Sequence, residues 1–507
     1  MAMKRNVEKN IDVIAKKVFA RAPVLQETVE RHGAKTLFLY ANEMQSVVLA
    51  ERYVHRRAEL VEVIKNRAAD VLGKASAEEI EKTLQTTYSV STADHHGPIC
   101  HPFFLNGNVL SALPAIQTPE QQAKSIAVLA CANVSLNNSS FPRGILFHNA
   151  NGQMEQIPMV SAQYGMRPVL AHPGYDMEDL LRARHAVQAK ILCHAIDKTT
   201  GEKLISVFEH VYGQAIALGA RDYSAQISIT NADLWRKFFS SSSVQAPELT
   251  YLAQEQLVGD LLAKHLLEKK TFVYALFGTI DGWEQIKKYF DGKEGAFNIS
   301  DQKGTFLFWA ITGAEKKRQQ VWCQRQRLET VDGSLSVECT AEALVAKIQA
   351  GELVPSMLVT FIVLSFYYGL VCRGGFYQPS YLTSLKDAYI TMLNNLGMSD
   401  EAAAVQSVET KRMGADMALS FARDKGGKLM QAAGLDLFLY GTNSTAQALL
   451  QTSKQMLVKE AIYVMMPLFY SILYSSSEQD NELRQVAESD VMELYRLEEK
   501  IKPCVEI

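Results

Sequence analysis

The residues best suited to chemistry are concentrated in one stretch, Ser91–Phe104, whose sequence is STADHHGPICHPFF. Asp94, His95, His96 and His101 all fall within it. Eight of the eleven histidines lie between positions 95 and 210, and none lies between 266 and 507. Imidazole is the usual general acid or base near neutral pH and a common metal ligand. This uneven distribution therefore indicates a functional site.

The spacing within the stretch is compatible with a metal site. Neighbouring residues of a strand point to opposite faces, but the irregular backbone expected at Gly97-Pro98 would let both adjacent histidines face one ion. Histidine and carboxylate ligands with one open position commonly hold a catalytic divalent ion, and Asp94 would serve as ligand or would orient a histidine. We expect the ligands of a divalent metal ion among His95, His96, His101, His148 and His172.

These groups predict a cytoplasmic, metal-assisted enzyme, hydrolytic in type, that acts on a small polar or anionic substrate. Its catalytic residues would be Asp94, His95, His96 and His101. The ion would lower the pKa of a bound water and polarise the bond to be cut. Two alternatives stay open. A metal-free transferase or lyase would use the same histidines for proton transfer, and a helical interaction protein or scaffold would keep them for structural reasons.

Two further segments carry side chains suited to binding the substrate. SLNNSSFPRG (residues 135–144) joins two expected strands, and its arginine could clamp a carboxylate or phosphate; an ordinary polar hairpin connection is the alternative. VCRGGFYQPSYLTSLK (residues 371–386) combines a glycine pair, which permits close backbone approach, with aromatic rings and an amide. A glycine helix cap with aromatics packed beneath it is the alternative there. The predicted substrate-binding residues are Asn137, Asn138, Arg143, Arg373, Gln378 and Tyr381.

Composition and missing motifs exclude several classes of protein. A net charge of −3 argues against nucleic acid as a partner. The seven cysteines form no C-x-x-C pair and no secretory leader is visible, so we expect a reducing, cytoplasmic compartment and no membrane. Walker A, G-x-G-x-x-G, G-x-S-x-G and H-E-x-x-H patterns are missing. The tripeptide of residues 94–96 also occurs in DHH-type phosphoesterases, but no D-x-D precedes it, and we do not assign that family.

The chain pattern predicts an α+β fold, mainly helical, with a central β-containing region. We expect an N-terminal helical region (1–90), a β-rich, histidine-containing core region (91–175), a mixed α/β region (176–352) and a C-terminal helical region (353–507). With no Pro- or Ser-rich linker between them, these regions should form one compact, interlocked body.

Local patterns give more specific expectations. Alternating apolar residues predict strands at 125–136, 143–148, 153–160 and 225–230, and a strand, a helix and a strand within 271–312. Asp332-Gly333 predicts a hairpin turn. Helices are expected at 176–196 with Asp176 as N-cap, around 249–269, and after a capping box of Ser76 with Glu79. The uncharged segment 353–372 is expected to be a buried core helix.

Overall fold

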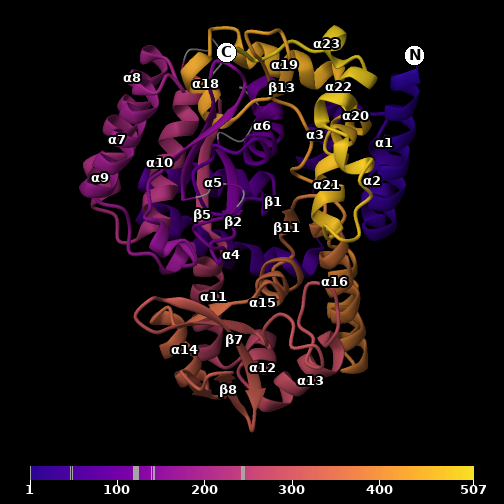
Figure 1. Ribbon diagram of the computed structural model, residues 1–507. Helices are drawn as coiled ribbons and strands as arrows, with labels where there is room; N and C mark the ends of the chain where they lie inside the picture. The colour runs from indigo at the N-terminus through magenta and orange to yellow at the C-terminus, as the bar shows by residue number, and fades with distance from the viewer. Residues whose placement is uncertain are drawn as a thin grey trace.

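The computed structural model describes residues 2–45, 47, 50–117, 125–138, 140, 143–240 and 246–507. The predicted fold class is confirmed, because helices dominate and several small sheets lie among them (Figure 1). The central sheet is entirely parallel, with the order β11-β1-β2-β5. Its strands are β1 (Ser89–Ser91), β2 (Ser125–Ala130), β5 (Glu248–Ala253) and β11 (Val371–Arg373).

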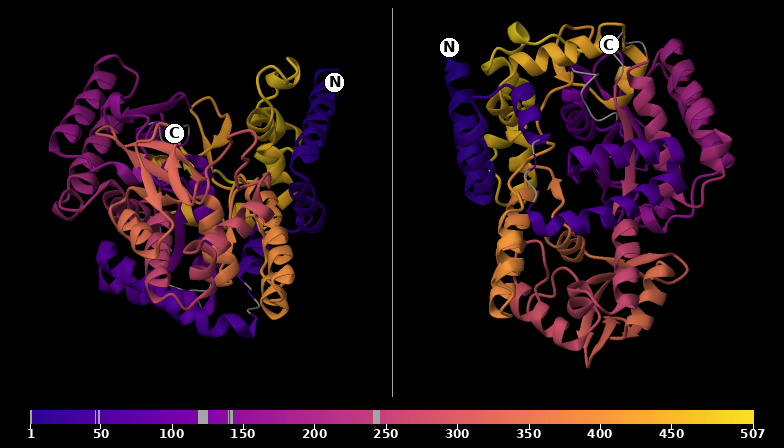
Figure 2. Two further views of the ribbon diagram at one scale, coloured as in Figure 1. Left: turned by 90° about the horizontal axis from the view of Figure 1, so that it is seen from below. Right: turned by 180° about the vertical axis from the view of Figure 1, so that it is seen from behind.

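Helices cover both faces of this sheet, so its strands are buried on both sides. Val128 and Tyr251 belong to one hydrophobic core, whereas Leu129 and Leu252 belong to a second core on the opposite face. Helices α4 and α5 cover the face that is turned toward the viewer from behind (Figure 2). The helices next to the sheet are α4 (Glu51–Leu72), α5 (Lys74–Thr86), α6 (Pro102–Gln117), α10 (Tyr223–Phe238) and α11 (Gln254–Glu268).

A second, antiparallel sheet lies below the first in Figure 1, with the order β10-β6-β7-β8-β9. We call residues 272–355, which contain it, the β lobe. Its strands are β6 (Phe308–Thr312), β7 (Lys317–Gln324), β8 (Arg327–Thr330), β9 (Ser336–Glu338) and β10 (Leu353–Pro355). Its helices are α12 (Phe272–Phe277), α13 (Ile280–Phe290) and α14 (Ala341–Gln349).

The rest of the chain packs around these two sheets. One side carries the hairpin of β3 (Gly144–His148) and β4 (Met154–Pro158), with α7 (Met177–Leu192), α8 (Lys198–Val207), a π-helix (Phe208–Tyr212) and α9 (Ala215–Leu218). The other side joins α1 (Ala2–Arg21), α2 (Pro23–His32) and α3 (Leu37–Gln45) to the C-terminal helices. These are α19 (Thr445–Gln455), α20 (Val458–Val464), α21 (Met466–Leu473), α22 (Glu488–Leu494) and α23 (Leu497–Lys500). Helix α18 (Gly434–Tyr440) packs instead against β3, α8 and α10, on the side of the hairpin (Figure 1). Strands β12 (Phe421–Arg423), β13 (Leu429–Gln431) and β14 (Val505–Glu506) form a small sheet of their own.

Several expected elements are confirmed. The strands at 143–148 and 153–160 form an antiparallel hairpin, and the turn at Asp332-Gly333 joins β8 to β9. Asp176 caps α7, because its carboxylate accepts the N–H groups of Glu178 and Asp179. The strand expected at 125–136 is present as β2 but ends at Ala130.

Other expectations are wrong. Residues 225–230 lie inside α10, which is capped by Asp222. This helix is buried along most of its length, so buried residues occur on all of its sides and its sequence resembles that of a strand. The strand expected at 271–279 is helix α12, capped by Thr271. The helix expected from 249 begins only at Gln254, because residues 248–253 form β5. The capping box at Ser76 is also wrong, since α5 begins at Lys74.

The buried helix expected at 353–372 is only partly helical. It contains β10, α15 (Met357–Phe361), a π-helix (Ile362–Tyr367) and β11 in succession. Within the described ranges, none of the helices has the length and apolar character needed to cross a membrane. After β11 the chain turns directly into α16 (Gln378–Asn395) and α17 (Ser399–Gln406).

Candidate functional site

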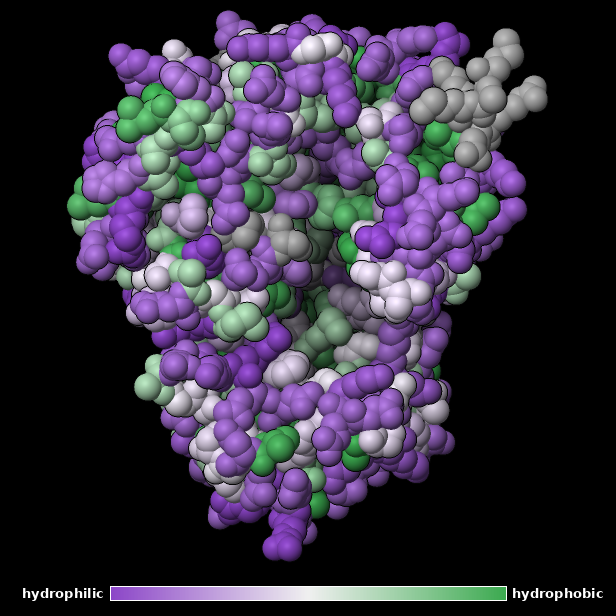
Figure 3. Space-filling model, viewed as in Figure 1, coloured by the Kyte–Doolittle hydropathy of each residue, from purple (hydrophilic) through white to green (hydrophobic). Residues whose placement is uncertain are grey.

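The carboxyl ends of the parallel strands open onto a cleft of about 360 Å³ between the central sheet and the β lobe. Figure 3 shows this face of the molecule hollowed at that level. Strand β1 lies between β2, which follows it in the chain, and β11, which joins the sheet last. Open α/β sheets bind ligands outside the carboxyl ends of their strands at such a reversal of strand order. The architecture therefore marks this cleft as the first candidate for a site.

Residues from all four parallel strand ends line the cleft. Its polar lining consists of Thr92, His95, Cys131, Asn133, Gln254, Glu255, Arg318, Gln378 and Asp416. Aromatic walls are supplied by Trp309, Phe361, Phe376, Tyr377 and Tyr381. An apolar wall with a few placed polar groups is the usual composition of a small-molecule site.

The glycine pair after β11 brings two polar side chains close to the backbone. A Cβ atom on Gly374 would lie 2.1 Å from the side chain of Gln378, and one on Gly375 would lie 2.3 Å from Oδ2 of Asp416. Gln378 donates to Oγ1 of Thr92 at 2.7 Å, and the hydroxyl of Tyr381 donates to Oε1 of Gln378 at 3.3 Å. Of the predicted substrate-binding residues, Gln378 and Tyr381 thus lie at the cleft.

Asp416 is a cleft residue that the sequence did not reveal. Its backbone has φ 59°, a left-handed conformation that is uncommon for a residue other than glycine, and its Oδ2 accepts the N–H of Phe376 at 2.8 Å. Burial raises its pKa to about 6, while the Phe376 N–H lowers it by less. A carboxyl group that titrates near neutral pH in a cleft is a candidate for proton transfer.

Glu255, in the first turn of α11, is almost fully buried at the opposite wall. Its carboxylate accepts the N–H of Ala132 at 2.8 Å, the N–H of Asn133 at 3.3 Å and the thiol of Cys131 at 3.1 Å. Burial raises the pKa of Glu255, and the hydrogen bonds only partly offset that effect. The carboxylate therefore ties the end of β2 to the start of α11.

The cation of the cleft is Arg318, on strand β7 of the β lobe. Its guanidinium stacks on Trp309, 4.4 Å from the ring centroid, and Nη1 donates to the carbonyl of Asn133 across the cleft. The residue as a whole is exposed, and partial burial of its guanidinium lowers its pKa. In the described part of the chain, no carboxylate lies within ion-pair distance of it. Its remaining N–H groups are therefore available to an anionic ligand.

The histidines of the predicted cluster do not converge on one point. His95 lines the cleft; burial lowers its pKa, Asn138 acts in the opposite sense, and its Nδ1 has no partner among the described residues. His101 lies close enough to His95 for their charges to interact, and burial lowers its pKa to about 4. His96 instead turns toward α10, where Nε2 lies 3.5 Å from Oγ of Ser228.

Asp94 lies behind the cleft lining, with no solvent exposure. Its Oδ2 accepts the amide of Asn108 at 3.1 Å, and its Oδ1 has no partner among the described side chains. Burial raises the pKa of Asp94 to about 7; the Asn108 amide and the Tyr251 hydroxyl lower it by less, and the charge of Asp416 adds the smallest increase. Asp94 is thus placed to influence Asp416 rather than to contact a ligand in the cleft.

Three other predicted site residues, His148, His172 and Arg143, lie in separate places. His148 Nδ1 is 2.6 Å from Oδ2 of Asp436, in a buried pair beneath α18. His172 Nδ1 is 3.3 Å from Nη1 of Arg167, and burial lowers the pKa of this histidine to about 4. Arg143 donates to the carbonyl of Val160 at 3.1 Å.

Arg373 is buried on the side of β11 away from the cleft lining, with Nη1 donating to Oγ of Ser111 at 3.3 Å. Burial lowers its pKa to about 10. Asn137 is exposed, and its backbone N–H donates to Gly165, whereas Asn138 lies beside His95. The cleft cation is therefore Arg318, instead of the predicted Arg143 or Arg373.

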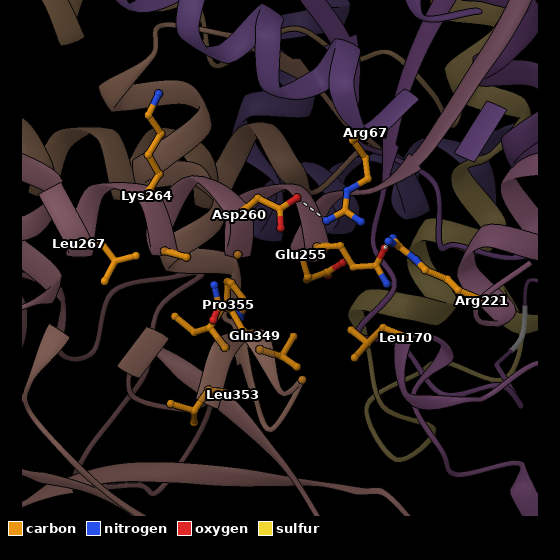
Figure 4. A pocket seen from close by; sticks show the side chains of 16 residues that line it. Arg67, Leu170, Arg221, Glu255, Asp260, Lys264, Leu267, Gln349, Leu353 and Pro355 are labelled. Atoms are coloured by element: carbon orange, nitrogen blue, oxygen red, sulfur yellow. Dashed lines mark hydrogen bonds and ion pairs between the residues drawn. The ribbon is translucent and has the colours of Figure 1, made fainter. Parts of the chain in front are cut away.

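A second hollow, of about 520 Å³, lies on the far side of Glu255 (Figure 4). Its charged side chains are largely paired with protein groups: Arg67 with Asp260, and Arg221 with Asp222 at 3.3 Å. Because these cations already have carboxylate partners, this hollow offers less to an anionic ligand than the cleft at Arg318.

The predicted metal ligands do not fit a metal ion as a set. In the ranges that the structure describes, no group of three or more His, Cys, Asp or Glu side chains is arranged to hold one. The divalent ion remains a prediction, and no step below depends on it. No model of a known protein family matches the chain, and no curated protein matches it in sequence. Inference about function therefore rests on the cleft itself.

Proposed function

We propose that the protein is an enzyme that binds a small, polar, anionic substrate in the cleft between the central sheet and the β lobe. One observation carries the proposal: Arg318, without a carboxylate partner among the described residues, shares the cleft with Asp416, whose pKa lies near neutrality. Arg318 would bind the anion, and the aromatic walls would hold the remainder of the substrate.

The protein's own groups support proton transfer in this cleft. With its pKa lowered, His95 is neutral at pH 7 and can accept a proton from water. With a pKa of about 6, Asp416 retains a proton in part of the molecules and can donate it to a leaving group. The environment lowers the pKa of His95 and raises the pKa of Asp416. Such a pair can act as a general base and a general acid. A hydrolytic reaction is the type that we favour.

Anion binding is tested by calorimetric titration with inorganic phosphate, pyrophosphate and malonate. We expect at least one to bind, and Arg318→Gln to weaken that binding by about 10- to 100-fold, as expected for a charge-assisted hydrogen bond of about 1.5–3 kcal/mol. Arg327→Gln is the matched control, because Arg327 lies on β8 of the same lobe and pairs with Glu338. Equal binding by wild type and Arg318→Gln would contradict the proposal.

Assistance by a divalent ion is tested separately. Elemental analysis of the purified wild type, His95→Ala and His101→Ala would show a metal in the wild type and its loss from both variants if the predicted ion is present. Equal metal content in all three proteins would show that these histidines hold no ion. Hydrolysis of 4-nitrophenyl phosphate, with and without EDTA, would show whether turnover needs the ion.

A further inference from the structure

Cys131 stands at the carboxyl end of β2 and faces the cleft. It pairs in parallel register with His95, so the two side chains extend from the same side of the sheet edge. Its thiol donates a hydrogen bond to Oε1 of Glu255 at 3.1 Å. Neither group has a part in the acid–base steps above, although both line the same cleft.

Two buried amide oxygens beside this thiol lack hydrogen-bond partners among the described residues. Oδ1 of Asn133 and Oε1 of Gln254 have none among the described residues, although their side chains are only 6% and 5% exposed. Both residues line the cleft. Buried polar atoms in proteins are nearly always hydrogen-bonded, so these acceptors point to a ligand that supplies N–H or O–H groups. The thiol thus borders a space fitted for a polar ligand.

We propose that Cys131 is a nucleophile that takes an acyl group from an activated carboxylic ester or thioester carrying an anionic group, with Glu255 accepting the thiol proton. This inference rests on the proposed function, because it uses the same cleft and the same anion-binding Arg318. It adds the class of substrate and a covalent intermediate. A sulfur nucleophile beside a carboxylate base follows the general pattern of nucleophilic catalysis.

The proposed steps balance as follows. The sulfur forms a bond to the carbonyl carbon while its proton passes to Glu255, and the carbonyl π electrons move to oxygen. The carbonyl re-forms, the bond to the leaving group breaks, and that group takes a proton from Asp416. Water then attacks the thioester and gives a proton to His95; the carbon–sulfur bond breaks, and the sulfur regains its proton from Glu255. Proton return from His95 to Asp416 through solvent completes the cycle.

The Cys131 thiol must lose its proton at the moment when its sulfur attacks the carbonyl carbon. Burial raises the pKa of Cys131 well above its usual value, and the negative charge of Glu255 raises it further, so the resting group is a thiol. Arg318 acts in the opposite sense. Serine hydrolases also start from a protonated nucleophile. Their hydroxyl is poorly acidic, and a base removes its proton only as the bond to the substrate forms.

The test uses mono(4-nitrophenyl) succinate, an activated ester with one carboxylate. We expect a stoichiometric burst of nitrophenolate and one succinyl group on Cys131, located by peptide mass mapping. Cys131→Ser should abolish the burst. Glu255→Gln keeps an acceptor for one of the two N–H groups, since Ala132 donates to Oε2 and Asn133 to Oε1. It should slow acylation by about 100-fold, the typical loss when a general base is removed. Cys193→Ser is the control, because that cysteine is exposed and remote from the cleft lining.

Two results would overturn the inference: succinyl groups only on exposed thiols such as Cys193, or acylation of Glu255→Gln at the wild-type rate with wild-type melting behaviour. Phosphate titration of Cys131→Ser separates this inference from the proposed function. Wild-type binding of phosphate without acylation of Cys131 would remove the thiol step and leave the anion site. Acylation without any anion binding would instead contradict the proposed function.

Discussion

Replacing Asp94 with Asn should stabilise the protein, and the gain should increase with pH. The folded state raises the pKa of Asp94 from 3.8 to about 7 through burial. Each pKa unit corresponds to about 1.4 kcal/mol, so ionising the buried carboxyl costs the folded state about 4 kcal/mol. The Asn variant has no such cost, and its amide oxygen can still accept the N–H of Asn108, which donates to Oδ2 of Asp94 at 3.1 Å.

The direction of the pH dependence follows from the number of protons that Asp94 holds in the folded and in the unfolded state. Below about pH 4 both states hold the Asp94 proton, so this residue adds no pH dependence. Between about pH 4 and 7 the folded state keeps a proton that the unfolded state has lost, so stability falls as pH rises. Above about pH 7 the full cost is present, and Asp94→Asn should show its full gain there.

Urea unfolding of wild type and Asp94→Asn at pH 5 and pH 8 measures the effect, with Asp70→Asn, an exposed carboxyl on α4, as the control. We expect a difference of about 1.5–2 kcal/mol at pH 5 and about 4 kcal/mol at pH 8 in favour of the variant. A variant less stable than wild type at pH 8, or an equal difference at both pH values, would refute the reasoning.

Two further substitutions test local packing, one beside the cleft and one at the buried pair beneath α18. Gly375→Ala places a Cβ atom 2.3 Å from Oδ2 of Asp416, and should lower the free energy of unfolding by about 1–3 kcal/mol. Gly426→Ala, whose nearest contact is a side chain at 3.2 Å, should change it by less than about 0.5 kcal/mol; equal losses in urea unfolding would contradict this. Asp436→Ala leaves buried His148 without its partner at 2.6 Å, and should cost about 3–5 kcal/mol. A loss below about 1 kcal/mol would show that this pair does not stabilise the fold.

The sequence led to the cleft through two segments. The histidine-rich stretch follows β1, and the glycine pair with its aromatics follows β11, so both lie at carboxyl strand ends. His95, Gln378 and Tyr381 line the cleft for that reason. The expectation that His95, His96 and His101 share one point differs from the geometry, because His96 turns toward α10 at the end of the strand.

Sequence patterns did not single out three other residues of the cleft: Arg318, Asp416 and Glu255. Arg318 comes from a different sheet, and Asp416 is placed by a left-handed backbone with no motif around it. Glu255 had a usable signal, because Gln254 and Glu255 directly follow the run ELTYLA, which forms β5. The expected helix around 249–269 includes this run, so the sequence does not mark Glu255 as lying at a strand end. Strands of three residues, such as β1 and β11, are also too short to show a period of two.

The most direct test of the central claim is a crystal structure of the protein soaked in selenate, whose anomalous scattering locates the bound anion. We predict selenate in the cleft, within hydrogen-bonding distance of the guanidinium of Arg318. Selenate bound in the hollow beside Arg67 and Arg221, with none in the cleft, would contradict it.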